Sequence, residues 1–111
     1  MMNKYLQQGH KLYYCGEQSR AAHYYQAIVK RTDNVVEEER SCALYMLSWI
    51  QVNQARAAKT LAELRQYYYQ AQLFLQLIQQ QFYPQQFDLP IMEAAILREL
   101  KWGYNSIVYN R

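Results

Sequence analysis

An uninterrupted run of helical apolar spacing between Arg56 and Phe82 constrains this chain more than any other feature. Its apolar residues follow one another at steps of three and four, in the order Ala57, Leu61, Leu64, Tyr68, Ala71, Leu75, Ile78 and Phe82. This spacing places them on one stripe of an α-helix, and no Gly or Pro interrupts it. At 1.5 Å per residue the segment would be about 40 Å long. The run therefore predicts a long helix over 56–82, along which shorter helices pack.

The first half of the chain divides into shorter helical segments. Asn3 can cap a first helix, and Gly16 ends it. A second helix then completes an antiparallel hairpin over 3–31. A central helix over 35–52 is apolar nearly all round, which predicts that it is buried between the hairpin and the long helix.

The C-terminal part begins with a break at Pro84, because proline disfavours helical geometry in the residue before it. A last helix over 89–102 follows, and Gly103 is expected to end it. The remaining tail to residue 111 is too apolar to stay free, so it should fold back or dock on a partner. The fold class predicted for the single domain 1–111 is all-α, with about five helices in antiparallel hairpins.

Composition excludes several classes of protein. The chain is 51% hydrophobic with only three Gly and two Pro, which fits a compact helical protein and argues against disorder. No segment has the length of apolar sequence that a membrane span or a signal peptide needs, so we expect a cytoplasmic protein. Cys15 and Cys42 are far apart in sequence and are expected to be free, buried thiols in a reducing compartment. The formal net charge of +3 is mild and does not indicate nucleic acid.

Aromatic residues are the main candidates for a binding surface. The chain holds twelve Tyr, whose large contact area and polar tip suit half-buried surfaces and interfaces. The favoured explanation for many of them is that they rim the core with their hydroxyls in water. The residues expected to contact a partner are Tyr13, Tyr24, Tyr45, Tyr67, Tyr69 and Trp102.

The first hairpin carries a spaced series of small and large residues, which reads Gly9, Leu12, Gly16, Ala21, Tyr25 and Ile28. Small residues let two helices approach, and the aromatic residue plugs the gap between them. In this spacing, residues 3–32 resemble a tetratricopeptide (TPR) unit, although Leu12 and Ile28 replace the Tyr and Ala that are usual there. A second unit after Met46 follows the pattern only in part, because Ala62 and Arg65 depart from it.

The TPR resemblance implies binding of a protein or peptide in a helical groove, without catalysis. Repeats of this kind normally need about three units for stability, so the long helix and the C-terminal helix would act as a cap. The leading hypothesis is a non-catalytic adaptor or chaperone, by analogy with small bacterial adaptors and secretion chaperones.

Nucleic-acid binding is the alternative. Arg56, Lys59 and Arg65 precede a run of tyrosines, and basic residues beside aromatic ones can bind phosphates and stack on bases. Glu63 lies within this patch and opposes that role.

Catalysis lacks a complete set of residues. His10, Cys15 and His23 are near one another in sequence, but no third group of evident kind would orient them. Their spacing does not suit zinc, and no Gly-rich phosphate loop is present. The sequence therefore predicts no enzyme activity, no metal and no cofactor.

Self-association through the long helix is a further hypothesis. The positions outside its apolar stripe include the neutral residues Gln66, Gln70, Gln76 and Gln80, which would not repel a second copy. Ordinary packing within the chain is the favoured explanation of the stripe.

Overall fold

The computed structural model describes residues 3–30, 37–81 and 89–109, and these residues form five α-helices without any strand. The helices are α1 (Lys4–Tyr14), α2 (Gln18–Lys30), α3 (Glu37–Ala55), α4 (Leu61–Gln81) and α5 (Leu89–Tyr109). The predicted all-α fold class is confirmed.

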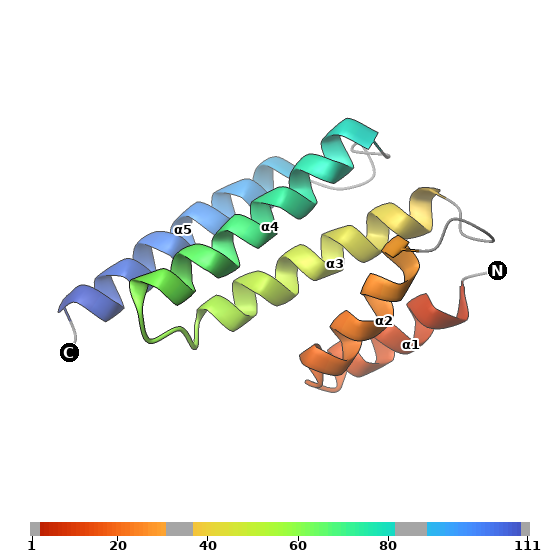
Figure 1. Cartoon of the computed structure of the whole chain (residues 1–111), viewed down its shortest axis with the longest axis horizontal. Coiled ribbons are helices and arrows are strands. Elements are labelled where there is room, and N and C mark those ends of the chain that lie inside the picture. The colour runs from red at the N-terminus through yellow and green to blue at the C-terminus, as the bar shows by residue number, and fades with distance from the viewer. Residues whose placement is uncertain (1–2, 31–36, 82–88, 110–111) are drawn as a thin grey trace.

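Each helix packs on the next one along the chain, and Figure 1 shows successive helices running in opposite directions. The α1–α2 hairpin covers one side of α3, and α4 covers the other. This confirms that the central helix lies between the hairpin and the long helix. The molecule measures 48 × 27 × 19 Å, so it is about two helix diameters thick. Helix α5 lies at the end of this flat stack and packs mainly on α4.

The first hairpin is held by close contact between α1 and α2. The Asn3 side chain accepts a hydrogen bond from the Tyr5 N–H at 2.8 Å, which confirms the predicted cap. Gly16 has a φ of 87°, a conformation that favours glycine, and it turns the chain toward α2. A Cβ placed on Gly9 would lie 2.8 Å from the fully buried ring of Tyr25. Helix α1 can therefore approach Tyr25 because residue 9 has no side chain.

Two apolar clusters lie on the two sides of α3. The first joins α3, α4 and α5 through Leu44, Val52, Ala55, Leu64, Tyr68, Ala71, Leu75, Ile78, Met92, Ile96 and Ile107. The second joins α1, α2 and α3 through Leu6, Leu12, Ala21, Tyr25, Ile28, Ala43, Met46, Leu47 and Ile50. The central helix contributes to both, which explains why it is apolar nearly all round.

The boundary between the central and long helices differs from the prediction. Helix α3 continues past residue 52 to Ala55, and α4 begins at Leu61 rather than at Arg56. Ala57, which we assigned to the apolar stripe, lies exposed in the loop between them. Thr60 starts α4, because its hydroxyl accepts a hydrogen bond from the Glu63 N–H at 3.1 Å. From Leu61 to Gln81 the helix is unbroken, as predicted.

The predicted end of the last helix is wrong. Gly103 does not stop α5, which continues to Tyr109. A Cβ on Gly103 would lie 2.8 Å from the Leu64 side chain, so this glycine allows α5 to approach α4. Most of the segment that we expected to fold back as a tail is instead the last part of α5. Phe82 and the break at Pro84 lie outside the described residues.

Candidate binding surface

The six aromatic residues predicted to contact a partner do not form one surface. Tyr13, Tyr24 and Tyr45 lie on α1, α2 and α3, Tyr67 and Tyr69 lie on α4, and Trp102 lies on α5. The first four are partly buried and pack against the two apolar clusters. Tyr69 and Trp102 are 59% and 56% exposed. The structure therefore leaves these two open for binding.

Tyr13 and Tyr45 have partners within the chain, as does a third partly buried tyrosine, Tyr24, whose ring lies 6.3 Å from that of His23. The Tyr13 hydroxyl accepts a hydrogen bond from the Asn53 side-chain amide at 3.2 Å, which links α1 to α3. Tyr45 makes an edge-to-face contact with Trp49, with ring centroids 6.3 Å apart. The contacts of Tyr13 and Tyr45 fix these two side chains in the fold.

Two of the three basic residues of the nucleic-acid hypothesis lie near acidic side chains. Arg56 forms an ion pair with Glu99 of α5 at 2.6 Å, and this hydrogen bond raises the pKa of Arg56. The Lys59 backbone N–H donates to the Glu63 carboxylate at 3.4 Å. Arg65 is exposed on α4. Arg56 is thus partly neutralised before any phosphate approaches.

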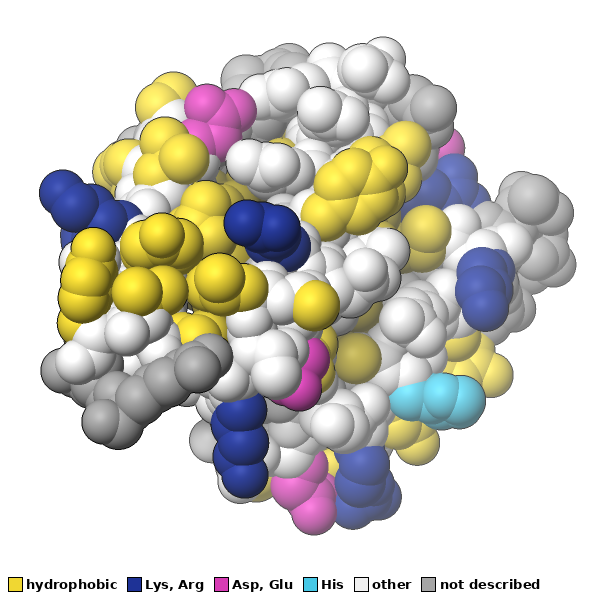
Figure 2. Space-filling view, turned by 60° about the vertical axis from the view of Figure 1, so that its left-hand side comes forward, with side chains coloured by type: hydrophobic (Ala, Val, Ile, Leu, Met, Phe, Trp, Pro, Cys, Tyr) yellow, Lys and Arg dark blue, Asp and Glu magenta, His cyan; other side chains and the backbone are white. Residues whose placement is uncertain are grey.

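Helix α5 carries most of the exposed apolar surface in the described part of the chain. Six of the nine exposed large hydrophobic side chains belong to it, namely Ile91, Leu97, Trp102, Tyr104, Val108 and Tyr109. Figure 2 turns the left-hand side of Figure 1, where α5 ends, toward the viewer, and hydrophobic side chains gather there beside a few charged ones. A helix that is apolar on so many sides is normally covered.

The open residues of α5 form two stripes, because residues three, four or seven apart share a face of a helix. We define the Leu97 stripe as Leu97, Lys101, Tyr104 and Val108. We define the Trp102 stripe as Ile91, Arg98, Trp102 and Tyr109. Met92, Ile96 and Ile107 form the third, buried stripe.

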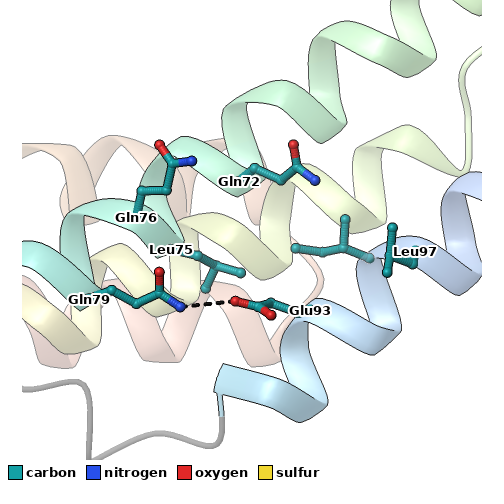
Figure 3. Close-up of a pocket in the computed structure, with 7 residues that line it drawn as sticks. Gln72, Leu75, Gln76, Gln79, Glu93 and Leu97 are labelled. Atoms are coloured by element: carbon teal, nitrogen blue, oxygen red, sulfur yellow. Dashed lines mark hydrogen bonds between the residues drawn. The ribbon is translucent and has the colours of Figure 1, made fainter.

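A groove between α4 and α5 borders the Leu97 stripe. It has a volume of about 270 Å³ and is lined by Gln72, Leu75, Gln76, Gln79, Glu93, Ile96 and Leu97. Figure 3 shows Gln79 and Glu93 pointing toward one another across it, and the Gln79 side-chain amide donates to the Glu93 carboxylate at 2.9 Å. The groove is therefore polar and mainly neutral on the α4 side, with the exposed Leu97 on the α5 side.

A second hollow adjoins the Trp102 stripe. Its lining consists of Arg56, Arg98, Glu99 and Trp102. Glu99 is engaged by Arg56, whereas Arg98 has no ion-pair partner among residues 3–30, 37–81 and 89–109. A large aromatic side chain thus lies next to an unpaired cation.

A cluster that the sequence reading missed lies between α1, α2 and α3. His10 Nδ1 is 2.6 Å from the Tyr25 hydroxyl oxygen, and His10 Nε2 is 3.7 Å from Cys42 Sγ. Burial lowers the pKa of His10, and burial together with the nearby Glu39 raises the pKa of Cys42. Both effects favour the neutral thiol and neutral imidazole, the opposite of the ionised pair that a cysteine nucleophile uses.

The fold gives the three residues considered for catalysis, His10, Cys15 and His23, different neighbours. His10 contacts Cys42 rather than Cys15, which is exposed at the end of α1. His23 is exposed on α2 and contacts the Tyr24 ring edge-to-face. In the described segments, no three His, Cys, Asp or Glu side chains are grouped as a metal site would require. None of the described helices is long and apolar enough to cross a membrane.

Comparison with known proteins finds no relative of this chain. No family model matches the sequence, and neither the curated proteins nor the solved structures contain a match.

Proposed function

We propose that this chain is a non-catalytic helical module that binds a peptide or helix of another protein through the Trp102 stripe of α5. The observation that carries the proposal is the exposure of Ile91, Trp102 and Tyr109 on one face of α5, the helix that carries six of the nine exposed large hydrophobic side chains in the described residues. Trp, Tyr and Arg are the residues that contribute most binding energy in protein interfaces. The Trp102 stripe contains all three.

The charge beside Trp102 indicates the chemistry of the partner. Arg98 is exposed, is separated from Trp102 by one helical turn and has no acidic partner in the described residues. A partner with an apolar anchor and an Asp or Glu near it would bury the anchor on Trp102 and pair its carboxylate with Arg98. An adaptor or chaperone role in the cytoplasm, where the two free thiols would remain reduced, is part of the proposal.

The first hairpin supports the class of module that we propose. Five of the six positions of the TPR-like series are buried, and the sixth, Gly16, makes the turn. The tight contact of Gly9 with Tyr25 is the packing that the series predicts. This supports a TPR-like hairpin, and α5 would then close the helical stack.

Selection from a peptide-display library on the immobilised protein tests the proposal. We expect enriched peptides to carry an apolar residue near an Asp or Glu. Trp102→Ala should weaken their binding about tenfold or more, as for other interface hot spots. Tyr69→Ala is the matched control, because Tyr69 is equally exposed but lies on α4. Binding that Trp102→Ala leaves intact, or that both variants abolish, would contradict the proposal.

The nucleic-acid alternative makes a different prediction. If Arg56, Lys59 and Arg65 bound phosphates, random-sequence RNA or DNA would bind with a steep dependence on salt. Because Arg56 is already paired with Glu99, we expect no such binding at physiological salt.

A further inference from the structure

We infer that a hollow on the α1–α2 hairpin binds an extended acidic segment of a partner protein, with a proline of that segment seated in the hollow. We call it the hairpin hollow. It has a volume of about 540 Å³ and is lined by Tyr5, His23, Tyr24 and Ala27. This surface lies on other helices than the Trp102 stripe and therefore goes beyond the proposed function.

Three aromatic rings line the hairpin hollow at an angle to one another. The ring centroids of Tyr5 and Tyr24 are 6.1 Å apart, and the two ring planes are inclined by 38°. The His23 ring meets the Tyr24 ring edge-to-face, with an angle of 89° between the planes. No two of these rings are therefore parallel, whereas a flat nucleic-acid base is held best on parallel ring faces. Inclined rings suit a compact group, such as the ring of a proline.

The hairpin hollow also offers hydrogen-bond donors. Among the residues that the structure describes, neither the Tyr24 hydroxyl nor the His23 ring nitrogens form a hydrogen bond. A tyrosine hydroxyl can donate, and so can one nitrogen of a neutral histidine ring. A proline-containing segment in the polyproline II conformation has no internal hydrogen bonds, so its carbonyl oxygens need donors. Aromatic-lined grooves recognise such segments in other proteins.

The charge of the hairpin favours an acidic segment. Residues 1–30 contain four basic residues and one acidic residue, all of them exposed, namely Lys4, Lys11, Arg20, Lys30 and Glu17. This surplus of three equals the formal net charge of the whole chain, so the charges of the remaining residues cancel. At the start of α3, Glu37 pairs with Arg40, and Glu39 accepts a hydrogen bond from the Asn3 N–H. An acidic partner is therefore attracted to the hairpin more than to the rest of the chain.

Two of the basic residues flank the hairpin hollow at equal spacing. Arg20 lies three residues before His23, and Lys30 lies three residues after Ala27, so the two cations are about 15 Å apart along α2. Arg20 pairs with Glu17 at 2.7 Å, but an exposed pair of this kind is weak and can exchange partners. Lys30 has no ion-pair partner in the described ranges 3–30, 37–81 and 89–109.

The spacing of the cations predicts a sequence for the bound segment. In the polyproline II conformation, every third residue lies on the same edge, and the rise is about 3.1 Å per residue. A segment Glu-x-x-Pro-x-x-Glu thus presents two carboxylates about 19 Å apart with the proline midway between them. The long side chains of Arg20 and Lys30 can reach outward to both carboxylates while the proline occupies the hollow.

Fluorescence anisotropy with a dye-labelled Glu-Ala-Ala-Pro-Ala-Ala-Glu peptide tests this on the full chain. The peptide should bind, and replacing its proline with alanine should weaken binding about fivefold or more. Tyr5→Ala and His23→Ala should do the same and retain the wild-type circular dichroism, because both side chains are exposed. Tyr14→Ala is the matched control, since Tyr14 is exposed on α1 outside the hollow. A chain that does not bind the peptide at its highest soluble concentration would overturn the proposal.

Charge exchange tests the role of Lys30. Lys30→Glu should weaken binding of the peptide about tenfold, because it replaces an attraction with a repulsion. Replacing one of the two peptide glutamates with lysine should recover most of that loss, and the glutamate concerned gives the direction of the segment. Lys101→Glu on α5 changes the net charge equally and should leave binding intact. Failure of both exchanged peptides to recover binding, or equal weakening by Lys101→Glu, would refute the pairing.

Variants of the two surfaces separate this site from the Trp102 stripe. Trp102→Ala should bind the acidic peptide as tightly as the wild-type chain does, and library selection on a Tyr5→Ala chain should still enrich peptides that need Trp102. Loss of the acidic peptide in Trp102→Ala would show that the hollow is not the site. Random-sequence single-stranded RNA that binds the wild-type chain but not Tyr5→Ala would show that the hollow holds bases, which contradicts the peptide proposal.

Discussion

At the scale of single residues, small side chains determine how closely the helices approach. Gly9 faces the ring of Tyr25, and Gly103 faces Leu64. Ser48 is fully buried, and its hydroxyl lies 3.1 Å from the Leu44 carbonyl oxygen and 3.3 Å from that of Ala71 on α4. At these positions α1 packs on α2, α5 on α4 and α3 on α4. Even a small increase in side-chain volume there should therefore lower the free energy of unfolding.

Gly9→Ala should destabilise the protein by about 2 kcal/mol, because the added methyl collides with a buried and rigid ring. An alanine in a helix would ordinarily stabilise by up to about 1 kcal/mol. Gly103→Ala is the comparison, since the Leu64 methyl that it meets ends a more flexible side chain and the loss should be smaller. Urea denaturation measures both, and a stabilised Gly9→Ala variant would contradict the packing.

Acid should weaken the fold through His10. Burial holds the pKa of His10 below its ordinary value of 6.5 in the folded protein. As the pH falls below 6.5, the unfolded chain therefore takes up a proton at His10 before the folded chain does, and the free energy of unfolding decreases. Urea denaturation across this range should show a flatter pH dependence for His10→Gln. An unchanged slope in that variant would show that His10 does not contribute.

At the scale of helices, the sequence predicts which face of a helix is buried better than it predicts the residue at which the helix ends. The spacing from Leu64 to Ile78 identified the buried face of α4 correctly, because burial follows the helical period. The same spacing led us to extend the predicted helix back to Ala57, because the sequence does not distinguish an alanine in a loop from an alanine in a helix. Thr60 and Glu63, in the capping pattern Thr-x-x-Glu, were the available signal for the true start.

Gly103 shows a different limit of sequence reasoning. A glycine near the end of an apolar helical pattern is usually a stop, and only the position of Leu64 on α4 reveals it as a contact. For the same reason, the two exposed stripes of α5 could not be predicted from the sequence. Its apolar residues could be counted from the sequence, but which of them face α4 depends on packing.

Thr60→Ala should destabilise the protein by about 1 kcal/mol through loss of the cap on α4. Lys59→Ala is a suitable control, because only the backbone of Lys59 takes part in the loop hydrogen bonds. Thermal denaturation of the two variants measures the difference. Equal midpoints for both would show that the Thr60 hydroxyl does not stabilise the helix.

At the scale of the whole molecule, α3 contributes buried residues to both apolar clusters, and Val29 of α2 and Phe74 of α4 also pack against both. Leu47 belongs to the cluster with α1 and α2, and Leu75 to the cluster with α4 and α5. Because both clusters depend on α3, we expect the chain to unfold as one unit. Leu47→Ala should cost about 3 kcal/mol and should reduce hydrogen-exchange protection in α5 as well as in α1. Loss of protection confined to α1 and α2 would show that the two halves unfold separately.

The flat stack of helices leaves α5 open, and we propose that a partner covers its Trp102 stripe. Trp102 fluorescence in a Trp49→Phe variant tests this directly, because Trp102 is then the only tryptophan of the chain. Adding a selected peptide that lacks tryptophan should shift the emission to shorter wavelength and protect it from acrylamide quenching, as expected for an indole moved out of water. A peptide that binds while the emission and quenching of Trp102 stay unchanged would contradict the account.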